Sequence, residues 1–315
     1  MSKKDTKAKE YMADNRRFAD LCNVALFDGE RVVLPSDLEE RDSTEVLSIL
    51  GVDSRDVEYQ QKWRDLLKSA VIKATGEAVY VLIGLENQSD IHYAMPVKSM
   101  IYDAMNYGTQ VKEAARRHRQ NKDFGLDAEF LSGFAATDKL TPIVPITLYL
   151  GADEWNAPVS LHEMFGEVDE KLLSYVPDYR IVLVAPNELD ASDLDKFETD
   201  LREVLGAIKY SKDKDKMDAF INGSSNFFCL ANETLEAINT FIDAKIEVNV
   251  KGGETNVCKA FDDMKKEIEL TTNMKNLRSL FANGGSFELA VKMFGDLSED
   301  VIRQVQEEVA TGMPA

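Results

Sequence analysis

The chain has 315 residues, with 37 Lys and Arg against 56 Asp and Glu, so its formal net charge is −19. This charge argues against a protein that coats nucleic acid or an anionic membrane through its overall field, and any polyanion it binds must meet a local basic patch. Ordinary Pro and Gly contents at this length predict a folded chain with one large domain, or a main domain and a smaller one.

Cysteine usage predicts a reducing compartment, and the hydropathy of the chain predicts neither a signal peptide nor a membrane span. The three cysteines, Cys22, Cys229 and Cys258, are far apart and lack C-x-x-C spacing, so neither a disulfide framework nor a structural zinc site is indicated. The N-terminus is basic but lacks the apolar stretch of a signal peptide. The longest nearly apolar run, Leu140 to Gly151, is too short to span a bilayer. We therefore expect a soluble, cytoplasmic protein with no membrane partner.

In chain order, the first part predicts a helix followed by strands. Apolar residues recur near helical spacing from Asp5 to Leu21, which predicts one amphipathic helix, and a short strand is expected at Val32 to Leu34. Residues Pro35 to Gln61 are acidic and polar and give no clear assignment. The apolar runs Trp63 to Ile72 and Ala78 to Leu85 are joined by a segment with a Gly, which predicts a hairpin. The second run is apolar on both faces, as in a central strand.

A long helix and two further strands complete a predicted α/β domain. Pro96 opens a helical stretch to about Gln120, and Ile143 to Leu150 and Tyr179 to Ala185 are apolar runs typical of strands. This order predicts a mixed central sheet flanked by helices. The apolar residues of the long helix fall near one face: Met100, Ile101, Ala104, Met105, Tyr107, Val111 and Ala115.

After the last strand the pattern is helical. Asp190 to Ile208 predicts a helix, and the tract Lys209 to Asp218, which alternates Lys and Asp, has the composition of a solvated helix or linker. The remainder, from about Phe227 to Ala315, predicts helices interrupted at Gly252-Gly253 and Gly284-Gly285. The chain therefore has a helical C-terminal region.

Two acids belong to the predicted hairpin. Asp65 lies in its first run and Glu86 closes the second, with Gln88 on the same face because side chains alternate along a strand. Two carboxylates drawn together favour a shared divalent metal with oxygen ligands. Mg²⁺, with Mn²⁺ as a substitute, held by Asp65, Glu86 and the carbonyl of Asn87 would polarise a phosphate and activate a water that Gln88 orients. The alternative is that both acids end strands in solvent.

A basic run ends the predicted long helix. Residues 112–122 carry a local net charge of +4, with His118 neutral, inside a chain of −19. Such a cluster can grip phosphates, or it can be an ordinary cationic helix end that complements the helix dipole. On the first interpretation, the residues that bind nucleic acid are Arg116, Arg117, Arg119 and Lys122.

Five short motifs carry a resemblance to a known bacterial family. They are Asp14-Asn-Arg-Arg-Phe-Ala-Asp-Leu, Arg64-Asp65-Leu66-Leu67, Ile83-Gly-Leu-Glu86-Asn-Gln88-Ser89, Met95-Pro-Val-Lys-Ser-Met-Ile-Tyr102-Asp103 and Pro142-Ile-Val-Pro-Ile-Thr-Leu-Tyr-Leu-Gly-Ala-Asp-Glu-Trp155. In this order they resemble the recombination-promoting nuclease (putative transposase) family of the PD-(D/E)XK nuclease superfamily. The resemblance covers about residues 5–215.

This resemblance implies a restriction-endonuclease-like core, metal-dependent DNA cleavage and a role in recombination or mobile-element biology. Asp65 corresponds to the D of the superfamily motif, Glu86 to the (D/E), and Gln88 to the Lys position. Asp14 corresponds to an early acid of the family, as an additional or water-mediated metal ligand. The E-x-Q pattern is usual for the family, and it leaves the general base open.

We therefore expect a Mg²⁺-dependent DNA endonuclease, with a catalytically degenerate module that binds DNA or protein as the alternative. The expected domains are a nuclease-like domain of residues 1–215 and a helical region of residues 216–315. Because the last helices are amphipathic and acidic, we expect them to pack on each other or to form a homo-oligomer rather than to contact DNA.

Overall fold

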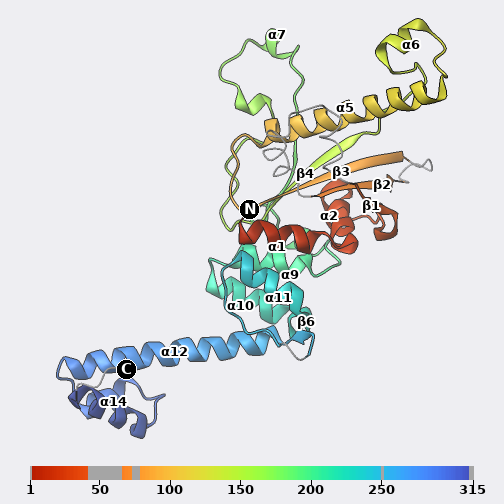
Figure 1. Ribbon diagram of the computed structural model, residues 1–315. Helices are drawn as coiled ribbons and strands as arrows, with labels where there is room; N and C mark the ends of the chain where they lie inside the picture. The colour runs from red at the N-terminus through yellow and green to blue at the C-terminus, as the bar shows by residue number, and fades with distance from the viewer. Residues whose placement is uncertain (1, 42–65, 73–78, 250–251, 312–315) are drawn as a thin grey trace.

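The computed structural model describes residues 2–41, 66–72, 79–249 and 252–311. Figure 1 shows a sheet with helices on both sides and a helical region that leads away to the C-terminus. The strands are β1 (Leu38–Glu40), β2 (Leu66–Ile72), β3 (Val79–Gln88), β4 (Ile143–Tyr149), β5 (Val182–Val184), β6 (Leu230–Ala231) and β7 (Glu254–Thr255). The α-helices are α1 (Lys3–Met12), α2 (Asn15–Phe27), α5 (Met95–Asn121), α6 (Asp127–Ser132), α7 (Glu170–Leu173), α8 (Ala191–Leu194), α9 (Leu201–Tyr210), α10 (Lys214–Gly223), α11 (Asn232–Phe241), α12 (Val257–Ala282), α13 (Phe287–Met293) and α14 (Glu299–Thr311), and the 3-10 helices are η1 (Pro35–Asp37), η2 (His162–Met164) and η3 (Ser225–Phe228).

Within these ranges, the central sheet has the strand order β1-β2-β3-β4-β5. Strand β2 pairs antiparallel with both β1 and β3, whereas β4 pairs parallel with both β3 and β5. The predicted hairpin is confirmed, with Leu66 opposite Leu85 and Ile72 opposite Val79. The connection between the parallel strands β3 and β4 contains α5, because parallel strands need a long crossover. The predicted α/β class, a mixed sheet flanked by helices, is therefore confirmed.

The two faces of the sheet pack against different elements. One face carries Ile83, Leu85 and Leu148, which join the main hydrophobic cluster with α1, α2, α9 and α11. The other face carries Tyr149, which packs with Met95 of α5 in a second, smaller cluster. Alternation along β4 assigns Thr147 to this second side with Tyr149, and the backbone pairs these two residues with Glu86 and Gln88 of β3.

The N-terminal segment differs from the sequence prediction. The single helix expected from Asp5 to Leu21 is wrong, because α1 ends at Met12 and α2 begins at Asn15. Asp14 stands between them in an extended conformation, and its carboxylate accepts hydrogen bonds from the backbone amides of Arg16 and Arg17. An N-cap of this kind starts a new helix and overrides the continuous apolar spacing.

The strand expected at Val32 to Leu34 is also wrong. The side chain of Asn23 in α2 accepts hydrogen bonds from the amides of Val32 and Val33 and donates one to the carbonyl of Val33. These backbone groups are therefore satisfied by a side chain and not by a neighbouring strand.

The helix expected from Asp190 to Ile208 is two helices, α8 and α9. Between them, the amides of Glu198 and Thr199 and the hydroxyl of Thr199 donate to the carboxylate of Asp20, which belongs to α2. This contact with a remote helix satisfies backbone amides of the segment between α8 and α9. The last strand is also shorter than predicted and spans Val182–Val184 only.

The long helix is confirmed as α5, but the face it buries is a polar one. Ile101 is 39% exposed and Ala104 is exposed, although both belong to the apolar set. The buried positions include Ser99, Asp103 and Asn106, which follow one another at spacings of four and three. Hydrogen bonds satisfy part of this polar face. Because its residues are polar, apolar periodicity did not reveal it.

The helical C-terminal region is confirmed, with a small addition. Strands β6 and β7 form a short antiparallel pair, and α12 ends near Gly284, whose φ of 81° needs a residue without Cβ. The main cluster continues beyond residue 215 through α10 and α11 to Cys258. A separate cluster joins α12, α13 and α14 around Leu277 and Ile302. Among the described residues, no helix is long and apolar enough to cross a membrane.

Candidate active site and nucleic-acid interface

The two acids predicted to bind a metal are neighbours in sequence of Leu66 and Leu85, a paired position of β2 and β3. Asp65 lies outside the described residues, but its neighbour Leu66 is paired with Leu85, the residue before Glu86. The backbone of Glu86 lies in β3 opposite Thr147 of β4. Strand β3 thus stands between an antiparallel and a parallel neighbour, and Glu86 lies near its carboxyl end, where open α/β sheets bind ligands.

Gln88 lies two residues further along β3 and is half-buried. Its side-chain Nε2 donates a hydrogen bond of 3.1 Å to the carbonyl oxygen of Asn87, the backbone atom predicted to bind the metal. The backbone of Glu86 pairs with Thr147 and that of Gln88 with Tyr149, which are alternate residues of β4. A cation at the Asn87 carbonyl would compete with the Gln88 amide, which could then turn toward a bound water.

Polar groups that the sequence reasoning missed lie on the same side of the sheet. Thr147 and Ser99 are fully buried, and within the described part of the chain neither hydroxyl has a hydrogen-bond partner. One turn after Ser99, Asp103 accepts a hydrogen bond of 2.5 Å from the hydroxyl of Tyr179. Buried hydroxyls without partners are costly and uncommon. Thr147 is the backbone partner of Glu86 on β4, so one of these hydroxyls belongs to the strand position beside the predicted site.

Asp14, the predicted early acid, serves here as the N-cap of α2. Its carboxylate also forms an ion pair of 3.1 Å with the exposed guanidinium of Arg16. Partial burial opposes ionisation, but the hydrogen bonds from Arg16 and Arg17 outweigh it and lower the pKa of Asp14. The carboxylate is therefore anionic, although its lone pairs are already shared with the helix start.

A buried lysine beneath Asp14 is a further residue that we did not anticipate. Lys68 in β2 is 1% exposed, and its Nζ donates hydrogen bonds of 2.6 Å each to the carbonyl of Ala13 and to Asn15 Oδ1. Burial lowers the pKa of Lys68, against the opposing fields of Glu40 and Asp14. The side chain holds the elbow between α1 and α2 against the sheet. Strand alternation alone could have found it, since Leu66 and Ala70 on either side point into the core.

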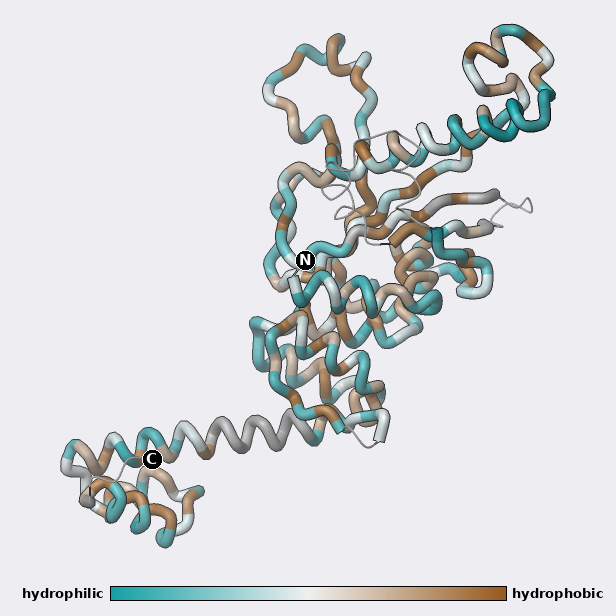
Figure 2. Tube along the Cα trace, viewed as in Figure 1, coloured by the Kyte–Doolittle hydropathy of each residue, from teal (hydrophilic) through white to brown (hydrophobic). Residues whose placement is uncertain are grey.

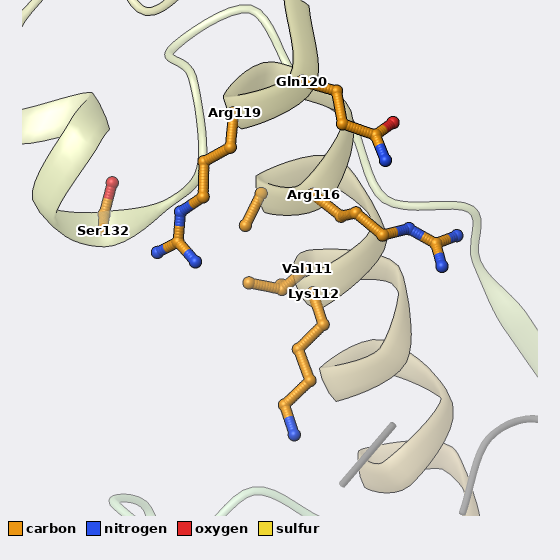
Figure 3. Close-up of a pocket in the computed structure, with 7 residues that line it drawn as sticks. Val111, Lys112, Arg116, Arg119, Gln120 and Ser132 are labelled. Atoms are coloured by element: carbon orange, nitrogen blue, oxygen red, sulfur yellow. The ribbon is translucent and has the colours of Figure 1, made fainter. Parts of the chain in front are cut away.

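The basic run of α5 lines a groove (Figure 3). Lys112, Arg116 and Arg119 are spaced by four and three residues, so they share one face of the helix. Arg116 and Arg119 are exposed, and neither has an ion-pair partner among the described residues. Figure 3 shows the Arg119 guanidinium extending toward Ser132 of α6 on the other side. The basic groove has a volume of about 600 Å³ and is lined by Val111, Lys112, Ala115, Arg116, Arg119, Gln120 and Ser132.

Arg117 and His118 belong to a different contact. Arg117 forms an ion pair of 3.0 Å with Asp138, and His118 hydrogen-bonds to both Asp123 and Asp138. These bonds to Asp123 and Asp138 raise the pKa of His118. Lys122 is exposed and ends α5 in the left-handed conformation, with a φ of 56°. The four predicted phosphate ligands are therefore split, with Arg116 and Arg119 in the groove and Arg117 engaged elsewhere.

Over the described ranges, no three His, Cys, Asp or Glu side chains gather as a metal site. Of the predicted metal ligands, Asp65 lies outside those ranges, and for Glu86 the backbone alone is described. The carboxylates and the Asn87 carbonyl are hard oxygen donors, the set that Mg²⁺ prefers. Their chemistry fits the predicted ion, and the backbone pairs Glu86 with Thr147, whose hydroxyl has no hydrogen-bond partner among the described residues.

Comparison with known proteins supports the family resemblance. The family model described as "Putative transposase, YhgA-like" matches residues 31–236, which is more than half of the chain. This range includes Asp65, Glu86, Gln88 and the basic run, and it leaves out Asp14. No curated protein and no solved structure matches the chain. The chain belongs to the YhgA-like putative transposase family.

Proposed function

We propose that this chain is a metal-dependent DNA endonuclease that acts in recombination or mobile-element biology. The observation that carries the proposal is the pairing of Leu66 with Leu85 at the end of the β2–β3 hairpin. Asp65 and Glu86 are each one peptide bond beyond this pair, and successive Cα atoms are about 3.8 Å apart. A ladder continued by one residue would bring the two acids opposite each other.

The surroundings of these acids suit phosphodiester hydrolysis. Mg²⁺ held by Asp65, Glu86 and the carbonyl of Asn87 would supply a Lewis acid for the phosphate and lower the pKa of a water. Gln88 would orient that water through its amide, which can donate and accept hydrogen bonds but cannot act as a base. The buried hydroxyls of Ser99 and Thr147 would hold further water or phosphate oxygens nearby.

The basic groove would hold the DNA backbone. It lies on α5, the helix that follows β3 after a short connection, so the phosphate contacts and the acids belong to consecutive elements. Clustered arginines on a helix attract phosphates without regard to sequence. The position of this local positive face within a chain of net charge −19 favours binding through one surface only.

A second function, a degenerate nuclease fold that binds DNA or protein without cutting it, is favoured by one observation. Gln88 stands where the superfamily has Lys, and its amide is bonded to the Asn87 carbonyl that the metal would use. A missing cation weakens stabilisation of the charged transition state. The two functions share the DNA-binding surface and differ in cleavage.

Nicking of supercoiled plasmid with Mg²⁺ separates these functions. We expect an open-circular product that EDTA abolishes. The nicking rate should fall at least about 100-fold for Asp65→Ala and for Glu86→Gln, because loss of a metal ligand costs more than loss of a residue that only orients a ligand. Glu288→Gln, an exposed acid of α13, is the matched control and should keep full activity. Binding without any nicking in Mg²⁺ or Mn²⁺ would establish the degenerate module instead.

DNA affinity as a function of salt tests the basic groove. Arg116→Ala with Arg119→Ala should lower affinity for every sequence and reduce the slope of log K against log salt by about 2, since each phosphate contact contributes about one. Arg117→Ala is the matched control, because its guanidinium is bonded to Asp138. If Arg117→Ala lowers the affinity and the salt slope as much per arginine as the double variant does, DNA binding depends on general charge and not on the groove.

A further inference from the structure

A short structured projection follows α5 and presents large apolar side chains to solvent. It comprises residues 124–140 and contains α6, and we name it the α6 finger. Leu126, Phe130 and Leu131 are 64%, 60% and 83% exposed. Figure 1 shows this projection at the far end of α5, away from the C-terminal helices, and Figure 2 shows apolar segments there beside the hydrophilic end of α5. Such a group of exposed apolar residues marks an interaction surface.

The finger is held in this shape by its own acids. The Glu129 carboxylate accepts hydrogen bonds from the amides of Gly125, Leu126 and Ala136, and Asp138 accepts one from Ala135. These bonds close the loop at both ends. The apolar side chains are therefore presented by a fixed frame and are not simply left over from a loose loop.

The base of the finger packs closely on α5. Gly133 has a φ of 71°, and a Cβ added to it would lie 2.7 Å from Cβ of Ala115. Phe130 packs edge-on against Phe124, whose ring in turn contacts His118. The finger thus keeps a constant position relative to the basic face of α5.

The finger borders the basic groove, and this determines the kind of partner. Ser132 of α6 lines the groove together with Arg116 and Arg119. The acids Glu129 and Asp138 are occupied by amides and by α5 side chains, which leaves Asp127 as an exposed acid of the tip. Cations beside a raised apolar edge complement a polymer that has phosphates outside and stacked bases inside.

We propose that the α6 finger is a DNA wedge that inserts Phe130 and Leu131 against unstacked bases while Arg116 and Arg119 hold the adjacent phosphates. Phe and Leu are residue types that wedge between base steps in known architectural proteins. Because a mismatch has already lost part of its stacking and pairing, the wedge enters it at lower cost. The preferred substrate class is therefore duplex DNA with a mismatch or a similar stacking defect. This inference rests on the DNA-binding part of the proposed function.

The test uses a duplex with 2-aminopurine beside a mismatch, and the same duplex fully paired, in EDTA so that no cleavage occurs. We expect the full-length chain to bind the mismatched duplex about tenfold more tightly and to raise 2-aminopurine fluorescence on binding. Phe130→Ser with Leu131→Ser should lose both effects and keep affinity for the paired duplex within about twofold, because phosphate contacts remain.

The matched control is Leu172→Ser with Tyr175→Ser, two residues near α7 that are 63% and 77% exposed. It should behave as the wild type, and thermal melts should show that both double variants fold. Equal mismatch preference and fluorescence in wild type and finger variant would overturn the wedge while leaving the nuclease proposal intact. If the finger variant differs from the wild type only in its molar mass by light scattering, the finger is a contact between protein chains and not a DNA wedge. Failure of the wild type to bind any DNA would overturn the wedge together with the proposed DNA binding.

Discussion

Lys68 places a charged side chain in the middle of an apolar strand, and its partners explain how the fold tolerates it. The Nζ replaces lost water with the Ala13 carbonyl and the Asn15 amide oxygen, both at 2.6 Å, and lies 4.8 Å from the centre of the Phe18 ring. A buried amine needs such partners, because desolvation disfavours the charged form.

We expect Lys68→Met to destabilise the protein by about 1–3 kcal/mol at pH 7, because the Ala13 carbonyl and Asn15 lose their donor. Urea unfolding measures this, with Lys9→Met, an exposed lysine of α1, as the control. Burial lowers the pKa of Lys68 from the ordinary 10.5. Between the lowered folded-state pKa and 10.5 the unfolded chain holds one more proton, so the wild type gains stability as pH rises through this window. Parallel pH curves for wild type and Lys68→Met would show that the amine is not perturbed.

Some residues of the candidate site were predictable and others were not. Asp65, Glu86 and Gln88 follow from a motif at the end of apolar strand runs, and the register of β2 and β3 agrees with the hairpin that links them. Ser99 and Thr147 could not be predicted, because they interrupt apolar patterns without forming a motif. Their burial depends on how α5 crosses the sheet, which is a tertiary property.

At the level of elements, long apolar runs were sufficient to predict strands and helices, but the breaks between neighbouring helices could not be predicted from them. Strands β3 and β4 and helix α5 are long enough for their patterns to be decisive. The break at Asp14 coincides with an N-cap. In the break before α9, backbone amides are satisfied by Asp20, about 180 residues earlier. The turn between β2 and β3 and the segment 42–65 lie outside the described residues, so the predictions made for them stay predictions.

Close packing between α9 and α10 gives a test at this scale. A Cβ on Gly206 would lie 2.0 Å from Cζ of Phe220, whose ring is held between Tyr210 and Phe227. We expect Gly206→Ala to lower stability by about 1–3 kcal/mol, since the overlap outweighs the gain in helix propensity of about 1 kcal/mol.

Thermal unfolding against Gly223→Ala provides the comparison. Gly223 ends α10, and nothing lies within 4 Å of an added Cβ, so this variant should be neutral or slightly more stable. Equal melting temperatures for the two alanine variants would mean that α10 does not pack on α9 in this register.

Over the whole molecule, one hydrophobic cluster joins the sheet to helices on both sides of the predicted boundary at residue 215. Arg17 of α2 is buried and forms ion pairs with Asp200, the residue before α9, and with Glu233 of α11, which ties the two parts together. The last three helices form their own cluster around Leu277 and Ile302. They pack on each other, as the acidic amphipathic pattern led us to expect, and homo-oligomer formation stays a prediction.

The proposal that Asp65 and Glu86 form one metal site can be tested by a single comparison of plasmid nicking rates in Mg²⁺. We predict that Asp65→Ala, Glu86→Ala and the double variant all fall to the same residual rate, because losing either ligand disables the whole site and residues acting as a unit are not additive. If the double variant loses the product of the two single losses, or if either single variant nicks at the wild-type rate, the two acids do not form one site.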